Sequence, residues 1–235
     1  LEVSVFPATT AAGGRALRRQ PAGARTVTRM ELDDLPYPDF DDFFAAYEKA
    51  PEGKNIIRAI PAESARGCWW GEKHHCTFCG LNGMTMKYRS KSPQRFADEL
   101  EYLVKRHGVK NVMVTDNILD MRYIHSIVPL LKKQRAHDAI FYEVKSNLTR
   151  EDLEALASAG ITELQPGVES LSTHVLQLID KGCTALQNVQ LLKWAEETGT
   201  TLVWTFLCGV PGETAEDYAE MVELMRKIPH LQPGR

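Results

Sequence analysis

From residue 55 onwards, apolar runs typical of strands alternate with amphipathic patterns typical of helices, and this alternation constrains the fold most strongly. Each strand–helix unit spans roughly 30–40 residues, the length of a crossover connection. Strands joined in this way lie parallel in one sheet, because right-handed crossovers return the chain to the same edge. The predicted strands cover residues 56–60, 109–115, 139–144, 161–168 and 201–207, and the predicted helices cover residues 93–107, 123–134, 149–159, 172–179, 184–198 and 214–227.

Two helices carry explicit start and stop signals. Ser92 is predicted to cap the helix over residues 93–107, which has proline at its first position and Gly108 just past its end. Thr149 and Asp152 form a capping-box pattern at the start of the helix over residues 149–159, and Gly160 is its predicted stop.

Two architectures contain a parallel sheet of this kind, an open doubly wound sheet and a β/α barrel. Neither the Gly-x-Gly-x-x-Gly fingerprint after the first strand nor a Gly-x-x-x-x-Gly-Lys-Ser/Thr loop is present. With 43% apolar and 25% charged residues, the chain has the composition of a globular domain. The sequence therefore predicts an α/β barrel or partial barrel, with functional groups at the carboxyl ends of its strands.

Three regions are predicted along the chain: a flexible segment over residues 1–29, a linker with a short helix over residues 30–54, and a core domain over residues 55–235. The arginines of the first region suit a contact with RNA or a membrane, but a solvated linker is the favoured interpretation. Asp41 or Asp42 is expected to cap the short helix. Because the chain begins with Leu and ends directly after a helical pattern, we expect a fragment of a longer protein.

Charge and composition exclude several classes of function. The net charge of -3 and the isoelectric point near 6.2 give no reason to expect nucleic-acid binding through bulk charge. No apolar run reaches the roughly 18 residues of a membrane span, and no secretory signal is recognisable. Five cysteines are too few for a disulfide scaffold, so we expect a cytoplasmic protein in a reducing compartment.

Three of the cysteines, Cys68, Cys76 and Cys79, follow the first predicted strand with the spacing C-x7-C-x2-C. Thiolates in such a cluster are the usual ligands of iron–sulfur clusters and of structural zinc. A cubane held by three cysteines keeps one iron open for a substrate, whereas His74 or His75 would complete a four-ligand zinc site. The spacing leaves both interpretations open.

The rest of the sequence resembles the radical S-adenosylmethionine (SAM) superfamily over residues 30–230. Its commoner spacing is C-x3-C-x2-C. The longer loop here, with the linker over residues 32–39, is similar to the group that matures ribosomally synthesised peptides (RiPPs), and to some cobalamin-dependent methylases. The resemblance implies a partial barrel that shows about five of the usual six units and stops before the sixth. Members of this group often carry a cobalamin-binding domain upstream, although this chain contains no Asp-x-His-x-x-Gly sequence.

Four further segments at successive strand ends carry the same resemblance, which implies that they bind SAM. Asp116 and Asn117 take the place of a segment that binds its amino group, and Glu143 and Lys145 share one face of a strand, where they would meet its amino and carboxylate groups. The pattern Gly-x-Glu-Ser and a Gly-x-Pro-Gly-Glu-Thr turn follow the next two strands. The implied cofactor-binding residues are Phe78, Gly80, Asp116, Asn117, Glu143, Lys145, Glu169, Ser170 and Val210.

The resemblance also implies the chemistry. Cys68, Cys76 and Cys79 would hold a [4Fe-4S] cluster whose open iron chelates SAM, and one electron would cleave the sulfonium to methionine and a 5′-deoxyadenosyl radical. The expected partners are a precursor peptide and an electron donor such as a flavodoxin or ferredoxin. Cobalamin and methyl transfer are expected only if the full-length protein contains a cobalamin domain. No catalytic side chain is assigned.

Several alternatives stay open at this point. One alternative is a radical SAM enzyme that acts on a tRNA base or a small metabolite. Another is a zinc-stabilised β/α binding module without catalysis. Trp69 and Trp70 either line a peptide channel or cover the cluster. Packing is the favoured role of the two remaining cysteines, Cys183 and Cys208. A solvated helix face is the favoured interpretation of Asp98, Glu99 and Glu101.

Overall fold

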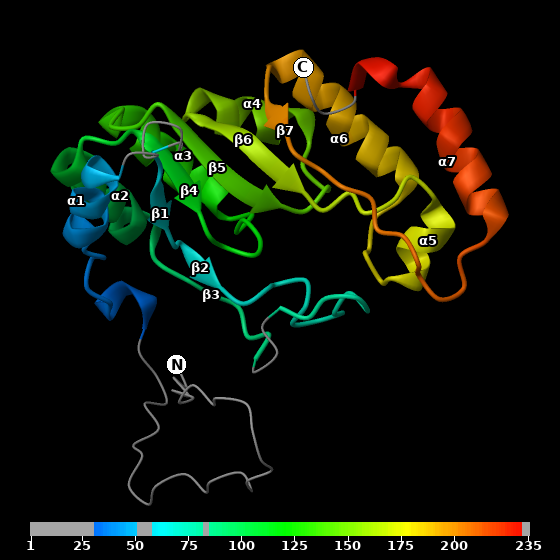
Figure 1. Ribbon diagram of the computed structural model, residues 1–235, viewed down its shortest axis with the longest axis horizontal. Helices are drawn as coiled ribbons and strands as arrows, with labels where there is room; N and C mark the ends of the chain where they lie inside the picture. Colours follow the sequence, from blue (N-terminus) through cyan, green and yellow to red (C-terminus); the bar gives the residue numbers. More distant parts are fainter. Residues whose placement is uncertain (1–30, 51–57, 82–84, 232–235) are drawn as a thin grey trace, which may run out of the picture.

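The computed structural model describes residues 31–50, 58–81 and 85–231 (Figure 1). Five parallel strands form one sheet in the order β1-β4-β5-β6-β7, and a two-stranded antiparallel pair, β2-β3, lies beside it. The strands are β1 (Ile60–Ala62), β2 (Ala65–Arg66), β3 (Arg89–Ser90), β4 (Asn111–Val114), β5 (Ala139–Val144), β6 (Ile161–Pro166) and β7 (Thr201–Leu202).

Helices connect these strands as the alternation predicts. A short 3-10 turn over Leu32–Asp34 precedes them and another, over Pro229–Leu231, ends the described chain. The helices are α1 (Asp41–Lys49), α2 (Pro93–His107), α3 (Tyr123–Gln134), α4 (Arg150–Ser158), α5 (Thr173–Leu178), α6 (Ala185–Thr198) and α7 (Ala215–Lys227).

Capping chemistry sets the limits of the main helices. The Ser92 side chain accepts a hydrogen bond from the backbone of Arg95 at the start of α2, and Gly108 ends this helix in the left-handed conformation. Thr149 and Asp152 form the predicted capping box of α4. The prediction for α1 is wrong in its cap: Phe40 holds the N-cap position, and Asp41 and Asp42 lie in the first turn. There their carboxylates still favour the positive end of the helix dipole.

The first and last strands differ from the predicted ranges. Residues 56 and 57 of the first predicted strand lie outside the described residues, residues 58 and 59 are not part of a strand, and β1 begins at Ile60. Pairing of β7 with β6 covers only Thr201 and Leu202 and resumes at an isolated bridge between Glu169 and Phe206. The interruption follows from Pro166, which has no backbone N–H to donate.

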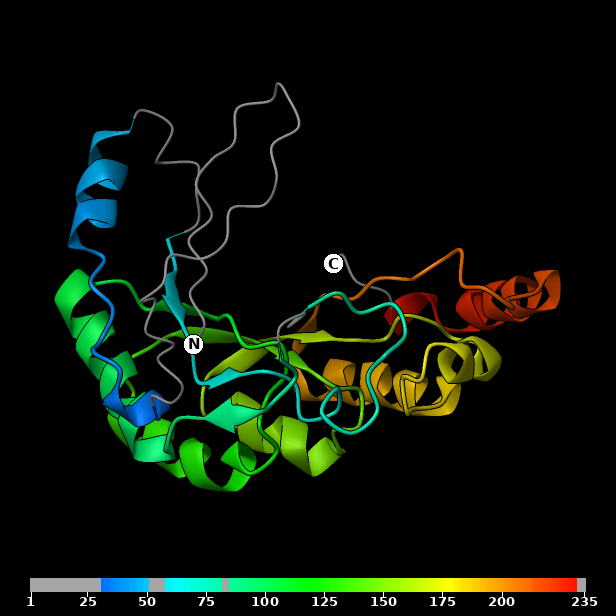
Figure 2. The ribbon, with the colours of Figure 1, turned by 90° about the horizontal axis from the view of Figure 1, so that it is seen from below.

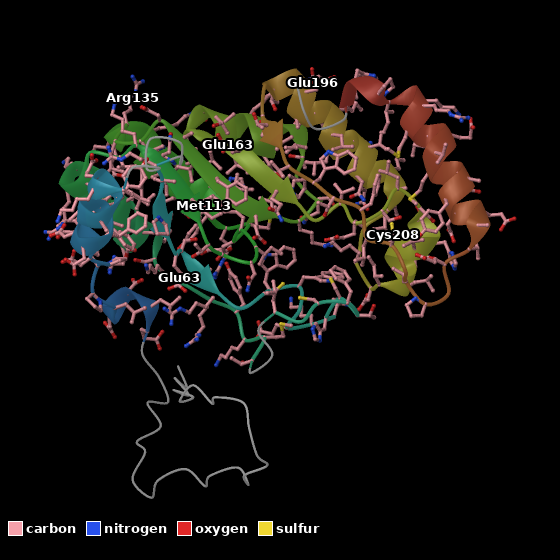
Figure 3. All side chains as sticks on the ribbon, in the orientation of Figure 1. Glu63, Met113, Arg135, Glu163, Glu196 and Cys208 are labelled. Carbon is pink, nitrogen blue, oxygen red and sulfur yellow. The ribbon has the colours of Figure 1, made fainter. Side chains whose placement is uncertain are left out.

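The main hydrophobic core lies between the sheet and the helices that cover one of its faces. Figure 2 shows α2, α3, α4 and α6 on the same side of the strands. Alternate residues of β5 are buried on that side, among them Ile140 and Tyr142, which are fully buried. In the described part of the chain no helix covers the other sheet face, on which Met113 and Glu163 lie (Figure 3).

This arrangement is a partial β/α barrel with five parallel strands, as predicted. The carboxyl ends of the strands lie along one edge of the sheet, where the loops that follow β1, β4, β5 and β6 meet. None of the helices in the described ranges has both the length and the apolar character that crossing a bilayer requires.

Candidate functional site

A cavity of about 160 Å³ lies at the carboxyl ends of the strands, and all three cysteines of the predicted cluster loop line it. The carboxyl ends of β5 and β6, the loops after β4, β5 and β6, and the turn after α5 supply the remaining walls. Four of the residues predicted to bind SAM, at or after strand ends, therefore line the same cavity as the thiols: Asn117, Glu143, Lys145 and Glu169. The lining residues are Cys68, Trp70, Cys76, Phe78, Cys79, Leu81, Asn117, Ile118, Glu143, Val144, Lys145, Gln165, Gly167, Glu169 and Lys181.

The cysteine loop is closed at its base by the β2-β3 pair, in which Arg66 lies opposite Arg89. Gly67 makes this closure possible. Its φ of +84° lies in the left-handed region, and a Cβ there would approach the Lys87 carbonyl oxygen to 2.2 Å. Within the loop, the backbone N–H of Glu72 donates to the Cys68 carbonyl, and that of Gly71 donates to the Cys68 sulfur at 3.3 Å. The thiols are thus presented from a short, internally bonded turn.

The two histidines of the loop have other partners. The His75 ring nitrogen Nε2 lies 3.1 Å from the carbonyl oxygen of Cys79. The His74 ring stacks on Trp70 with 4.1 Å between ring centroids, and its Nδ1 lies 3.9 Å from an oxygen of Asp180. These contacts support the interpretation of both histidines as loop residues rather than as ligands.

The donor chemistry of the cavity fits an iron–sulfur cluster. Three thiols line one cavity. Burial raises the pKa of the Cys76 thiol because it disfavours the charged thiolate, whereas the nearby ammonium groups of Lys181 and Lys145 lower it. Among residues 31–50, 58–81 and 85–231, no group of three or more His, Cys, Asp or Glu side chains is placed so that it could hold a metal ion. Thiolates are ligands of both iron–sulfur clusters and structural zinc.

Five of the residues predicted to bind SAM line the cavity: Phe78, Asn117, Glu143, Lys145 and Glu169. Burial raises the pKa of Glu143, and the nearby Lys181 opposes this shift. Lys145 is 7% exposed, and burial lowers its pKa. Its Nζ donates to the backbone carbonyls of Lys181 and Gly182, the second at 3.2 Å. The Lys145 ammonium therefore has backbone partners within the protein, and its predicted contact with SAM stays a prediction.

Four predicted site residues do not line the cavity. Asp116 is 1% exposed and accepts hydrogen bonds from the backbone N–H and the hydroxyl of Ser64, so its carboxyl group joins the ends of β1 and β4. The Ser170 hydroxyl is buried and donates to the sulfur of Met221. Val210 packs in a small apolar cluster. Gly80 lies in open space, since a Cβ there would meet no atom within 4 Å.

Lys181 is the charged cavity residue that the sequence did not predict. Its Nζ donates to the Glu169 carboxylate at 3.0 Å and lies 5.5 Å from the centre of the Phe78 ring. It follows α5 rather than a strand, so it does not belong to the polar residues that follow the predicted strands. The one available signal is the Asp-Lys-Gly sequence over residues 180–182, which places a cation in a turn directly after a helix.

The structure also places the two tryptophans of the cysteine loop and the two cysteines outside it. Trp69 donates from its ring N–H to the Leu119 carbonyl at 3.0 Å, and Trp70 donates to the Asp180 carbonyl at 3.0 Å, so both tryptophans tie the cysteine loop to neighbouring loops. Cys183 is buried, as expected. Cys208 is exposed, so its expected packing role is wrong.

The buried carboxyl of Asp116 gives the fold a predictable pH dependence. Burial raises its pKa to about 7 against the opposing hydrogen bonds from Ser64. The folded chain therefore binds a proton that the unfolded chain releases near pH 4, and the free energy of unfolding falls as the pH rises from about 4 to about 7. We expect Asp116→Asn to remove this component of the slope. Urea unfolding of the cluster-free protein at pH 5 and pH 8 measures it; equal slopes for both proteins would contradict the assignment.

Comparison with known proteins bears directly on this site. The sequence profile of the radical SAM superfamily matches residues 63–225. The chain is 25% identical over 207 residues to an uncharacterised methyltransferase of Pyrococcus horikoshii, covering 85% of this chain and 42% of that protein. It is 27% identical over 219 residues to the anaerobic magnesium-protoporphyrin IX monomethyl ester cyclase of Rubrivivax gelatinosus, covering 88% and 38%. The chain thus spans less than half the length of these relatives.

Among solved structures, the fold is similar to that of the radical S-adenosylmethionine methyltransferase TsrM from Kitasatospora setae, determined with cobalamin and a [4Fe-4S] cluster bound. The TM-score is 0.62 at 18% sequence identity, and the match covers 73% of this chain and 32% of that one. At this identity the likeness concerns the fold.

Proposed function

The chain belongs to the radical SAM superfamily, and from this premise we propose that it holds a [4Fe-4S] cluster on Cys68, Cys76 and Cys79 and cleaves SAM. The observation that supports the proposal most strongly is the single cavity shared by these thiols with Lys181 and Glu169. When bound and reduced, such a cluster supplies the electron that splits SAM into methionine and a 5′-deoxyadenosyl radical.

The side chains around the thiols suit the two ends of the methionyl group of SAM. Lys181 offers an ammonium group to a carboxylate, a charge-assisted contact that Glu169 keeps oriented from 3.0 Å. Glu143 and Asn117 line the same cavity and offer oxygen acceptors to an amino group. The resemblance of Gly-x-Glu-Ser to the family pattern gives Glu169 a second role toward the ribose.

The other residues predicted to bind SAM either support the cavity indirectly or have roles that stay predictions. Asp116 fixes the end of β4 from behind the cavity and thereby places Asn117. Ser170 accepts from the backbone N–H of Ser172 at 3.0 Å and so supports the turn that presents Glu169. Phe78 lines the cavity, where its ring excludes water, while the roles of Gly80 and Val210 toward the adenine remain predictions from the resemblance.

A ribosomally synthesised peptide is the proposed substrate. The linker and the long cysteine loop resemble those of the RiPP maturation group. The sheet face without helices offers room for such a substrate: Met113, Phe141 and Glu163 lie in register across β4, β5 and β6, and Met113 is 51% exposed (Figure 3). Apolar side chains beside a carboxylate on an open face suit an extended chain with mixed side chains.

Methyl transfer to a carbon of this peptide is the proposed outcome. It is supported by the methyltransferase among the relatives and by the TsrM structure, which contains cobalamin. Cobalamin would be held by another part of the whole protein, since this chain lacks the Asp-x-His-x-x-Gly sequence. A flavodoxin or ferredoxin is the proposed electron donor, and the cytoplasm is the proposed compartment because its thiols stay reduced.

Anaerobic reconstitution with iron and sulfide, followed by EPR of the reduced protein with and without SAM, tests the cofactor assignment. We expect a [4Fe-4S]⁺ signal that changes shape when SAM is added, and formation of 5′-deoxyadenosine with dithionite as reductant. Zinc without labile sulfide in the purified protein would instead establish the zinc-stabilised binding module.

The substrate is tested separately, by mass spectrometry after incubation of the whole protein with cobalamin, SAM and a reductant. Short peptides encoded beside the gene are expected to gain the mass of one methyl group. A relative whose name gives a porphyrin as its substrate favours one competing outcome, modification of a small molecule, and a modified tRNA nucleoside is the other. Either result would overturn the peptide assignment and leave the cofactor assignment intact.

A further inference from the structure

The connection between α5 and α6 lies directly on the cysteine loop. The backbone N–H of Thr77 donates to the carbonyl of Ile179 at 3.1 Å, and the ring N–H of Trp70 donates to the carbonyl of Asp180 at 3.0 Å. The two segments are about a hundred residues apart in sequence, yet the cavity cation Lys181 sits between these contact points and the buried Cys183. Its position therefore depends on the contact between the loops.

Gly182 and Trp70 form the closest part of this contact. A Cβ on Gly182 would lie 2.0 Å from the Cη2 atom of Trp70 and 2.1 Å from its Cζ2 atom, so the indole rests on the backbone. Gly182 also has a φ of +65°, in the left-handed region that glycine adopts without cost. No larger residue fits this position without moving the tryptophan.

Lys145 holds the same contact from the sheet side. Its Nζ donates to the carbonyls of Lys181 and Gly182 and lies 4.2 Å from the centre of the Trp70 ring, within cation–π distance. The ammonium therefore binds the backbone of the turn and the face of the indole at once. His74 stacks on Trp70 as well and faces Asp180, which adds a second link between the two loops.

We propose that Trp70, Lys145 and Gly182 are positioning residues that couple the cysteine loop to Lys181. Lys181 is then in place to bind the SAM carboxylate only when the cysteine loop packs against the turn after α5. This inference rests on the proposed function. Because coupling between two binding events is reciprocal, SAM must in turn stabilise the loop that holds the cluster. Bound SAM is therefore expected to slow the release of iron to a chelator.

The test combines Lys145→Met with Lys181→Met on the reconstituted chain. Lys145→Met keeps a long side chain but removes the ammonium that binds the turn, and Lys181→Met removes the proposed SAM contact itself. We expect each to weaken SAM binding, measured by equilibrium dialysis with labelled SAM, by about 10-fold or more, the scale of typical coupling between sites. Iron and sulfide content should stay close to that of the unmodified chain.

The double variant distinguishes coupling from general damage. If Lys145 acts through Lys181, the double variant binds SAM as weakly as Lys181→Met alone, whereas independent effects would multiply. SAM should protect the cluster from chelation in the unmodified chain and in Lys73→Met, an exposed lysine of the same loop, but not in Lys145→Met. Gly182→Ala should behave like Lys145→Met, because its methyl group displaces Trp70.

Two results would overturn the coupling. One is an unchanged SAM affinity and unchanged protection in Lys145→Met; the other is a double variant in which the two losses multiply. Failure of the proposed function looks different, because the unmodified chain would then hold no iron–sulfur cluster or show no SAM binding at all.

Discussion

Replacing Cys76 by alanine is expected to abolish the cluster. Its thiol lines the cavity together with those of Cys68 and Cys79. Loss of an outer partner of a metal ligand already costs roughly 10–100-fold in affinity, and loss of a ligand itself should cost more. After anaerobic reconstitution, the variant should lack the visible absorbance and labile sulfide of the unmodified chain and form no 5′-deoxyadenosine.

Cys208→Ala is the matched control, because this exposed thiol does not line the cavity. It should retain iron, sulfide and SAM cleavage at the level of the unmodified chain. If Cys76→Ala kept a full cluster absorbance, the ligand assignment would be wrong; if both variants lost it, damage common to any cysteine replacement would be the cause.

Glu99→Ala should strongly destabilise the helical layer. Glu99 is fully buried on α2 and accepts hydrogen bonds from Lys91 Nζ at 2.9 and 2.8 Å and from Arg95 at 2.6 Å. Lys91 is itself only 4% exposed. Removing the carboxylate leaves this ammonium buried without its counter-charge, which typically costs about 3–5 kcal/mol.

Urea unfolding of the cluster-free chain measures the effect, and Asp98→Ala serves as the control. Asp98 is the exposed neighbour on the same helix and bonds only an exposed side chain, Gln94, at 2.7 Å. Its replacement should change the free energy of unfolding by less than about 0.5 kcal/mol. Equal effects of the two replacements would show that the buried ion pair does not stabilise the fold.

Local signals predicted most of the helices and the central strand closely. The helix over Tyr123–Gln134 and the strand over Ala139–Val144 have the predicted limits, and α2 runs from Pro93 to His107 as its caps indicate. These limits follow from neighbouring residues alone, since a cap or an apolar period acts within one or two turns. The cysteine loop was also recognisable from neighbouring residues, through the spacing of its three thiols, and these thiols share one cavity.

The environment of single polar residues was not predictable in this way. Glu99 was expected on a solvated face with Asp98 and Glu101, yet it is buried because Lys91, eight residues away, is folded back onto it. Asp116 and Asn117 are adjacent in sequence, but one faces Ser64 in the interior and the other faces the cavity. In both cases the deciding partner lies outside the residue's own turn or strand.

The sequence by itself determined the alternating parallel architecture, the grouping of three cysteines in one loop and the family resemblance, because periodicity, capping and short motifs act locally along the chain. Only the tertiary structure decided which charged groups share the cavity. Lys181 enters it from the turn after α5, and Lys145, which also lines the cavity, donates to the carbonyls of that turn. Contacts between residues far apart in sequence depend on how the elements pack, and no local pattern records them.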